Sequence, residues 1–170
     1  MKKLVFILLF IPLISFGQSY KDLMSISSVD MFKKVAIENR YEFDSLDDDG
    51  WVSYGFNITR DSIEGNKASN WAGYGTKTGN WVFKYSKTGT NPVASLLGAL
   101  LESNIPTEEI TETPYDLITE TIKEKCKYYK ILNHNGTDYV TYSCSESSYK
   151  GKIGFVIEEG TGFIRHFPPQ

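Results

Sequence analysis

The chain of 170 residues contains little of what catalytic and metal sites usually require. It has two histidines and two cysteines, and it has no HExxH or paired CxxC pattern that would hold zinc. No glycine-rich phosphate loop is present, so nothing indicates nucleotide binding. The 21 acidic residues outnumber the 18 basic ones, and no basic stripe of the kind that binds nucleic acid occurs. The sequence therefore predicts no metal, no cofactor and no nucleic-acid partner.

Long hydrophobic runs are also scarce, and the one at the N-terminus is short. Positions 1–17 contain two lysines, an apolar stretch that includes Pro12, and the small-x-small end Ser15-Phe16-Gly17. This arrangement is typical of a secretory signal peptide, whereas a membrane span needs about 20 apolar residues. We expect cleavage after Gly17, so that the mature chain begins at Gln18, is periplasmic or secreted, and has no membrane anchor.

Two halves of the remaining sequence correspond to each other when one is shifted by 86 residues. Ser27-Ser28-Val29-Asp30 then aligns with Thr113-Pro114-Tyr115-Asp116. In both, a hydroxyl residue stands three positions before an acid, which favours the start of a helix. Asp49-Gly50 aligns with Asn135-Gly136, and both dipeptides favour two-residue hairpin turns because those turns need positive φ. Each half is therefore expected to begin with a helix and a hairpin.

A second hairpin follows in each half, around Thr78-Gly79 and Glu159-Gly160. Residues 18–87 and 113–170 then form two units, and residues 88–112 connect them through a short amphipathic helix. We predict an α+β fold with two tandem α-β-β-β-β repeats in one compact domain. The simplest assembly joins both units in one antiparallel sheet with the helices on one face. A separate sheet for each unit is the alternative.

This element order resembles that of tandem α/β-repeat proteins such as the β-lactamase inhibitor proteins. The resemblance rests on the order of the elements and carries no individual residue over. It implies a secreted protein that binds a partner across its sheet.

Two-residue turns would also determine which strand residues face each other. In the first half Phe43 would pair with Phe56, and in the second half Tyr129 would pair with Tyr142. All four would lie on the side that meets the helices. The last strand fits less well, because Phe163 falls one position out of phase with the aromatic residues of the corresponding strand in the first half. A bulge is one explanation.

The opposite side of the sheet should be polar, yet the same pairing places large apolar side chains there. They are Leu46, Trp51, Tyr128, Leu132 and Tyr139. A patch of this kind on an open sheet face is typical of an interaction surface. The alternative is that the connector or the strand ends cover it. We interpret these five residues as a candidate partner-binding site.

Cys126 follows the second predicted helix, and Cys144 ends the strand after the Asn135-Gly136 turn. The expected pairing places them about one position out of register, close enough for a disulfide with modest adjustment. Export supplies an oxidising compartment. A catalytic thiol with His134 or His166 as its base would need a cysteine that stays reduced after export. We therefore predict a Cys126–Cys144 disulfide.

An acidic cluster, Asp44 with residues 47–49, superficially suggests calcium. An EF-hand loop needs an acid at its first and twelfth positions, where this sequence has Ser45 and Phe56. A solvated acidic hairpin turn explains the cluster better. Weak calcium binding at the turn is left open.

The function that these patterns favour is binding. We expect an exported, non-catalytic protein, monomeric or weakly dimeric, that engages a protein partner through the open face of its sheet. One alternative is an envelope hydrolase that uses carboxylates such as Glu158 and Glu159. Another is a glycan-binding module whose tryptophans, Trp51, Trp71 and Trp81, stack on sugars.

Overall fold

The computed structural model describes residues 18–86, 113–145 and 150–169. Its helices are α1 (Tyr20–Ser25), α2 (Val29–Glu38) and α4 (Pro114–Lys125). The strands of the first half are β1 (Tyr41–Leu46), β2 (Trp51–Phe56), β3 (Asn70–Gly75) and β4 (Trp81–Ser86). Those of the second half are β5 (Lys127–His134), β6 (Thr137–Ser143), β7 (Lys152–Glu158) and β8 (Thr161–Phe167). The predicted signal peptide, 1–17, and the connector, 88–112, lie outside the described residues.

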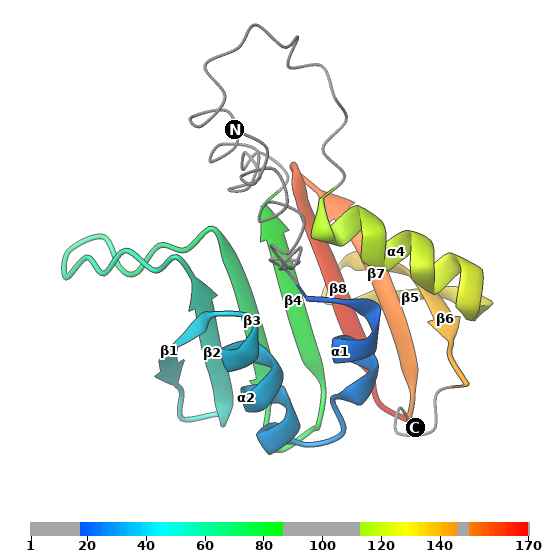
Figure 1. Ribbon diagram of the computed structural model, residues 1–170, viewed down its shortest axis with the longest axis horizontal. Helices are drawn as coiled ribbons and strands as arrows, with labels where there is room; N and C mark the ends of the chain where they lie inside the picture. Colours follow the sequence, from blue (N-terminus) through cyan, green and yellow to red (C-terminus); the bar gives the residue numbers. More distant parts are fainter. Residues whose placement is uncertain (1–17, 87–112, 146–149, 170) are drawn as a thin grey trace, which may run out of the picture.

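The strands form one antiparallel sheet of eight strands in the order β1-β2-β3-β4-β8-β7-β6-β5. The described helices lie on one face of it, α2 over the first half, α4 over the second, and α1 between them in front of β8 (Figure 1). The α+β class is thereby confirmed. The two halves share a single sheet because β4 pairs with β8, so the alternative of two separate sheets is wrong.

Side-chain caps explain where the helices begin. The Ser28 hydroxyl accepts a hydrogen bond from the first turn of α2, one position later than the aligned pattern predicted. Thr113 and Asp116 form a reciprocal capping box at α4, as that pattern indicated. Helix α1 is an additional element that the sequence analysis missed. It could have been found, because Ser19 and Asp22 form the same kind of capping box.

The hairpin turns follow the expected positions with one difference. Asn135-Gly136 forms a two-residue turn in which both residues have positive φ, 52° and 88°. Asp49-Gly50 belongs to a longer loop, because the last pair before it joins Leu46 to Val52. The carboxylate of Asp47 accepts a hydrogen bond of 2.7 Å from the first amide of β2 and closes this loop.

A bulge in the edge strand β1 changes its predicted pairing. The register shifts after Phe43, which pairs with Tyr54 rather than with Phe56. Paired residues of antiparallel strands point to the same side, and an extra residue reverses the alternation beyond it. Leu46 therefore points to the helix side together with its buried partner Val52, and not to the opposite face where a two-residue turn would have placed it.

A second bulge lies in the other edge strand, β5. The register shifts after Tyr128, so that Tyr128 pairs with Tyr142, the partner expected for Tyr129. Tyr142 packs against the core, which places Tyr128 on the helix side. The ring of Tyr129 lies 4.6 Å from Lys152 Nζ on the opposite face. The bulge thus exchanges the predicted faces of these two tyrosines.

The hydrophobic core lies between the sheet and the helices. In the first half it is aromatic: Phe32 of α2 is fully buried, and its ring centroid lies 5.9, 5.4 and 5.8 Å from those of Tyr54, Tyr74 and Phe83. In the second half, buried aliphatic side chains predominate. They include Ile118 and Ile122 of α4, Ile153 of β7 and Ile164 of β8. The three helices that the structure describes all lie on this one face of the sheet.

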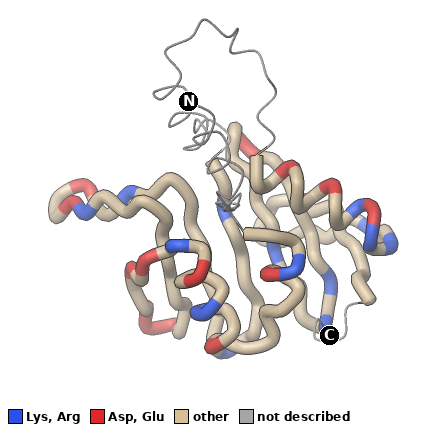
Figure 2. The backbone as a smooth tube through the Cα atoms, viewed as in Figure 1, with Lys and Arg blue, Asp and Glu red and all other residues tan. Residues whose placement is uncertain are grey.

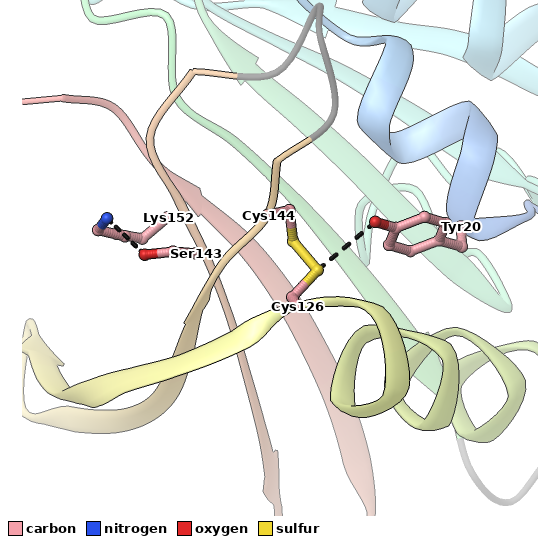
Figure 3. Close-up of a disulfide and its surroundings, with 5 residues drawn as sticks. All are labelled: Tyr20, Cys126, Ser143, Cys144 and Lys152. Carbon is pink, nitrogen blue, oxygen red and sulfur yellow. Dashed lines mark hydrogen bonds between the residues drawn. A yellow bond between two sulfur atoms is a disulfide. The ribbon is translucent and has the colours of Figure 1, made fainter.

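A disulfide joins the end of α4 to the end of β6 (Figure 3), as predicted. Because of the β5 bulge, the last pair of the β5–β6 ladder is Lys127 with Ser143. This register sets Cys126 directly opposite Cys144, with their Cα atoms 4.5 Å apart, and removes the expected offset of one position. The hydroxyl of Tyr20 in α1 lies 3.5 Å from Cys126 Sγ, so α1 also packs against the bond.

Candidate partner-binding face

The face of the sheet away from the helices, here called the outer face, carries an open groove. The groove crosses β2, β3, β4 and β8, extends to Tyr139 of β6, and has a volume of about 270 Å³. Its lining residues are Trp51, Ser53, Trp71, Ala72, Gly73, Val82, Lys84, Tyr139, Phe163 and Arg165. The register explains its centre, because Val82 pairs with Arg165 and Lys84 pairs with Phe163 across the junction of the two halves.

Glycines of β3 form part of the floor of the groove. The indole of Trp51 lies over both Gly73 and Gly75, in the space that a Cβ atom at either position would occupy. A strand without side chains at these positions lets a large ring approach the backbone closely. Trp51 therefore rests against the sheet as one wall of the groove.

Tyr139 forms another wall and is only 4% exposed. Its ring centroid lies 5.5 Å from that of Phe167 and 5.8 Å from the guanidinium carbon of Arg165. A Cβ atom at Gly154 would lie 2.8 Å from Cε2 of Phe167 and 3.0 Å from Tyr139 Cβ, so Tyr139 and its neighbour Phe167 are packed closely against a glycine of β7. Tyr139 thus shapes the groove by its packing and offers little exposed surface of its own to a partner.

Positive charge lies in the groove, next to aromatic rings. Lys84 Nζ lies 5.8 Å from the ring centroid of Phe163. Arg165 Nε is buried and has no hydrogen-bond partner in the described part of the chain. The described lining includes no acidic residue, and acidic residues are found chiefly on the helices and loops (Figure 2). The groove therefore combines apolar surface with positive charge, which favours a partner of opposite charge.

The structure separates the five residues of the predicted patch. Trp51, Leu132 and Tyr139 lie on the outer face, and two of them, Trp51 and Tyr139, line the groove. Leu46 and Tyr128 lie on the helix side because of the two bulges, and they are 61% and 55% exposed. The predicted residues therefore do not form one continuous surface.

Several groove residues were absent from the predicted patch, namely Trp71, Lys84, Phe163 and Arg165. The sequence contained a signal for one of them. Phe163 falls out of phase with the aromatic residues of the corresponding strand because it points to the outer face. No bulge is involved, since Ile164 is buried and pairs directly with Phe83. The irregular phase of the last strand was therefore a sign of a second apolar face.

The alternative of a catalytic thiol is wrong, because both cysteines are in the disulfide. His166 is buried in the sheet, with Nε2 2.6 Å from the carbonyl oxygen of Lys150 and Nδ1 3.2 Å from that of Gly79. Its ring stacks on Trp81 at a centroid distance of 5.6 Å. Burial lowers the pKa of His166, and the two hydrogen bonds oppose this shift. These contacts are those of a structural residue.

The acidic residues considered for catalysis or calcium lie away from the groove. Glu158 and Glu159 are exposed at the turn between β7 and β8 and are not part of the lining. In the acidic hairpin, Asp44 accepts a hydrogen bond of 2.6 Å from Asn66 Nδ2. Within residues 18–86, 113–145 and 150–169, no group of three or more His, Cys, Asp or Glu side chains is arranged to hold a metal ion.

Among the helices that the structure describes, none is long and apolar enough to span a membrane.

No protein-family model, curated protein or solved structure matches the chain. The resemblance to the β-lactamase inhibitor proteins therefore remains one of element order alone. The function has to be inferred from the groove itself.

Proposed function

We propose that this is an exported, non-catalytic binding protein that engages a protein partner through the groove on its outer face. The observation that supports this proposal is that partly buried aromatic side chains lie next to two cations on the face that the described helices leave uncovered. Contiguous aromatic surface next to arginine is characteristic of interaction sites. Export rests on the basic and apolar N-terminal segment.

We infer the chemistry of the partner from the residues that line the groove. Trp51, Trp71 and Phe163 offer apolar ring surface for an aromatic or aliphatic side chain. Lys84 and Arg165 offer N–H donors to a carboxylate, and Arg165 Nε has a donor that no described residue uses. An extended segment that combines an aromatic residue with Asp or Glu would satisfy both features.

Site-specific photocrosslinking in the native host tests the proposal. Lys84 is exposed and lines the groove, so a photoreactive phenylalanine analogue at this position reports on what occupies it. The matched control is the same analogue at Lys34, which is exposed on α2 on the helix side.

We expect one protein to be crosslinked from position 84 and not from position 34. The same product should weaken when Trp71→Ala is added, because the partner then loses a ring contact. Identical products from both positions, or a product that Trp71→Ala leaves unchanged, would contradict the proposal.

Glycan binding is a second candidate, because Trp51 and Trp71 line the same groove and indole rings stack on sugars. Trp81 would not contribute, since it is fully buried on the helix side. Electrophoresis through soluble polysaccharide separates the candidates. Retardation that a Trp51→Ala/Trp71→Ala variant loses would favour a glycan, and unchanged mobility of the wild type would favour a protein.

We also infer that the two halves are copies of one α-β-β-β-β unit and that the protein is a monomer or weak dimer. The support for duplication is that each half runs from a capped helix into two successive hairpins. In the sheet, the last strands of the two halves lie side by side and the first strands form the two edges. That order is what two equivalent units produce when they join through equivalent strands.

A further inference from the structure

Gln18 is the described residue nearest the N-terminus, and it is only 4% exposed. Its Oε1 atom accepts hydrogen bonds from the hydroxyls of Tyr85, at 2.7 Å, and Tyr41, at 3.5 Å. Its Nε2 atom is buried and has no hydrogen-bond partner in the part of the chain that the structure describes. One end of the carboxamide is therefore satisfied and the other is not.

The two tyrosines determine what this site accepts. Burial raises the pKa of Tyr41 and of Tyr85 above the ordinary value of 10.0, so both hydroxyls are neutral donors at physiological pH. A carbonyl oxygen suits such a pair. An NH₂ group brings two further donors, and a buried donor without an acceptor destabilises a fold. The site therefore fits a group that has the carbonyl of Gln18 but lacks its NH₂ group.

We propose that Gln18, once it is the amino terminus, cyclises to pyroglutamate, and that this lactam is the native occupant of the site. The inference rests on the expected cleavage after Gly17, which is part of the proposed export. The α-amino nitrogen attacks Cδ, the Cδ–Nε2 bond breaks, and Nε2 leaves as ammonia with a proton from the amine. No oxidant or reductant is required. The product keeps the carbonyl oxygen on Cδ and loses the buried NH₂ group.

The same reaction removes a charge from the edge of the core. A free α-amino group is largely protonated near neutral pH, and charge next to a buried group is costly. The lactam N–H is neutral. A charged amino terminus is not required to position Ser19, because the amide of Ser19 already donates a hydrogen bond of 2.8 Å to Asp22 Oδ2. Cyclisation thus removes the charge of the new amino terminus and keeps a carbonyl oxygen that can accept the hydrogen bond from Tyr85.

Mass spectrometry of the mature protein tests the inference. The full chain is produced with its own signal sequence in the native host, and its N-terminal peptide is mapped. We expect the peptide to begin at Gln18, to be lighter by the mass of one ammonia, and to resist an aminopeptidase. A peptide that begins at Gln18 with a free amine and an intact amide would overturn the inference and leave the proposed export standing. A chain that retains residues 1–17 would count against both.

A second measurement tests whether the lactam fits the site. The polypeptide 18–170 is unfolded, treated or not treated with a glutaminyl cyclotransferase, and refolded. We expect a folding equilibrium constant on the order of ten-fold larger for the cyclised chain, because one buried unpartnered donor group is gone. The advantage should shrink in a Tyr85→Phe background, since the carbonyl loses its shorter hydrogen bond. Equal stability of the cyclised and uncyclised chains would overturn the proposed fit.

Discussion

Each half of the sheet follows a helix, α2 or α4, with two successive hairpins, but the two halves are stabilised by different contacts. In the first half, α2 covers the strands, and its Phe32 lies among rings from β2, β3 and β4. In the second half, α4 covers its strands with isoleucine side chains, and the Cys126–Cys144 disulfide ties the helix to β6. The first half is thus stabilised by buried aromatic rings, and the second by aliphatic packing together with a covalent bond. The comparison shows that two regions with a similar order of elements can be stabilised by different contacts.

The largest expected effect is that of Phe32→Ala in the first half. Phe32 is fully buried, and removal of a buried phenylalanine ring lowers the free energy of unfolding by about 3–5 kcal/mol. Urea unfolding measures this loss. Ile37→Ala in the same helix is the matched control, because Ile37 is 62% exposed and its truncation should change little. Equal small losses for both variants would show that the aromatic cluster is not what holds this half.

The next largest effect is expected from removal of the disulfide in the second half. The two cysteines are 18 positions apart in the sequence, and a crosslink over a loop of that size contributes about 3 kcal/mol. Urea unfolding of the oxidised protein, the reduced protein and a Cys126→Ser/Cys144→Ser variant measures the contribution. We expect the last two to lose similar amounts. An unchanged midpoint on reduction would mean that the second half is held by packing alone.

A smaller effect is expected at the outer face, from Gly73→Ala. The new Cβ atom would meet the indole of Trp51, and overpacking of this kind costs about 1–3 kcal/mol. The ring has to move, so partner capture from position 84 should fall as well. Ser53→Ala is the control, because Ser53 lines the same groove but its truncation adds no atom that would displace the Trp51 ring. Native stability and native capture in Gly73→Ala would show that the glycine floor does not position the ring.

The elements of the fold were predictable because their signals are local. The Thr113 cap and the Asn135-Gly136 turn each depend on residues within a few positions of one another. The bulges were not predictable from the same patterns. At Tyr129 the ring contacts Lys130 of its own strand and Lys152 of β7, so the geometry depends on a strand that comes later in the chain. One extra residue then changed the face assigned to Tyr128.

The groove was harder to predict than the elements, for a related reason. Its centre is made where β4 meets β8, and the pairs Val82–Arg165 and Lys84–Phe163 join residues from opposite halves of the chain. No local pattern specifies that neighbourhood. Alternation along a strand shows which side chains share a face, but it does not show which strands lie next to each other. The residues that meet on the outer face can therefore be found only once the strand order is known.

The smallest expected effect is a pH dependence at the junction of the two halves. His166 approaches carbonyl oxygens from both halves, those of Gly79 and Lys150, and burial lowers its pKa below the ordinary value of 6.5. The unfolded chain therefore takes up this proton more readily than the folded protein. The stability that the neutral ring provides is complete above pH 6.5 and is lost as the pH falls from there toward the lower pKa of the folded state.

Thermal unfolding between about pH 7.5 and about pH 5.5 measures this dependence, because histidine is the side chain that ordinarily titrates in that interval. We expect Tm to fall with pH in the wild type and to fall less steeply in His166→Asn. His134→Asn is the control and should keep more of the decline, since His134 is less buried. Parallel profiles for the wild type and His166→Asn would assign the decline to other groups, and the junction would then owe its stability to strand pairing between β4 and β8 rather than to this ring.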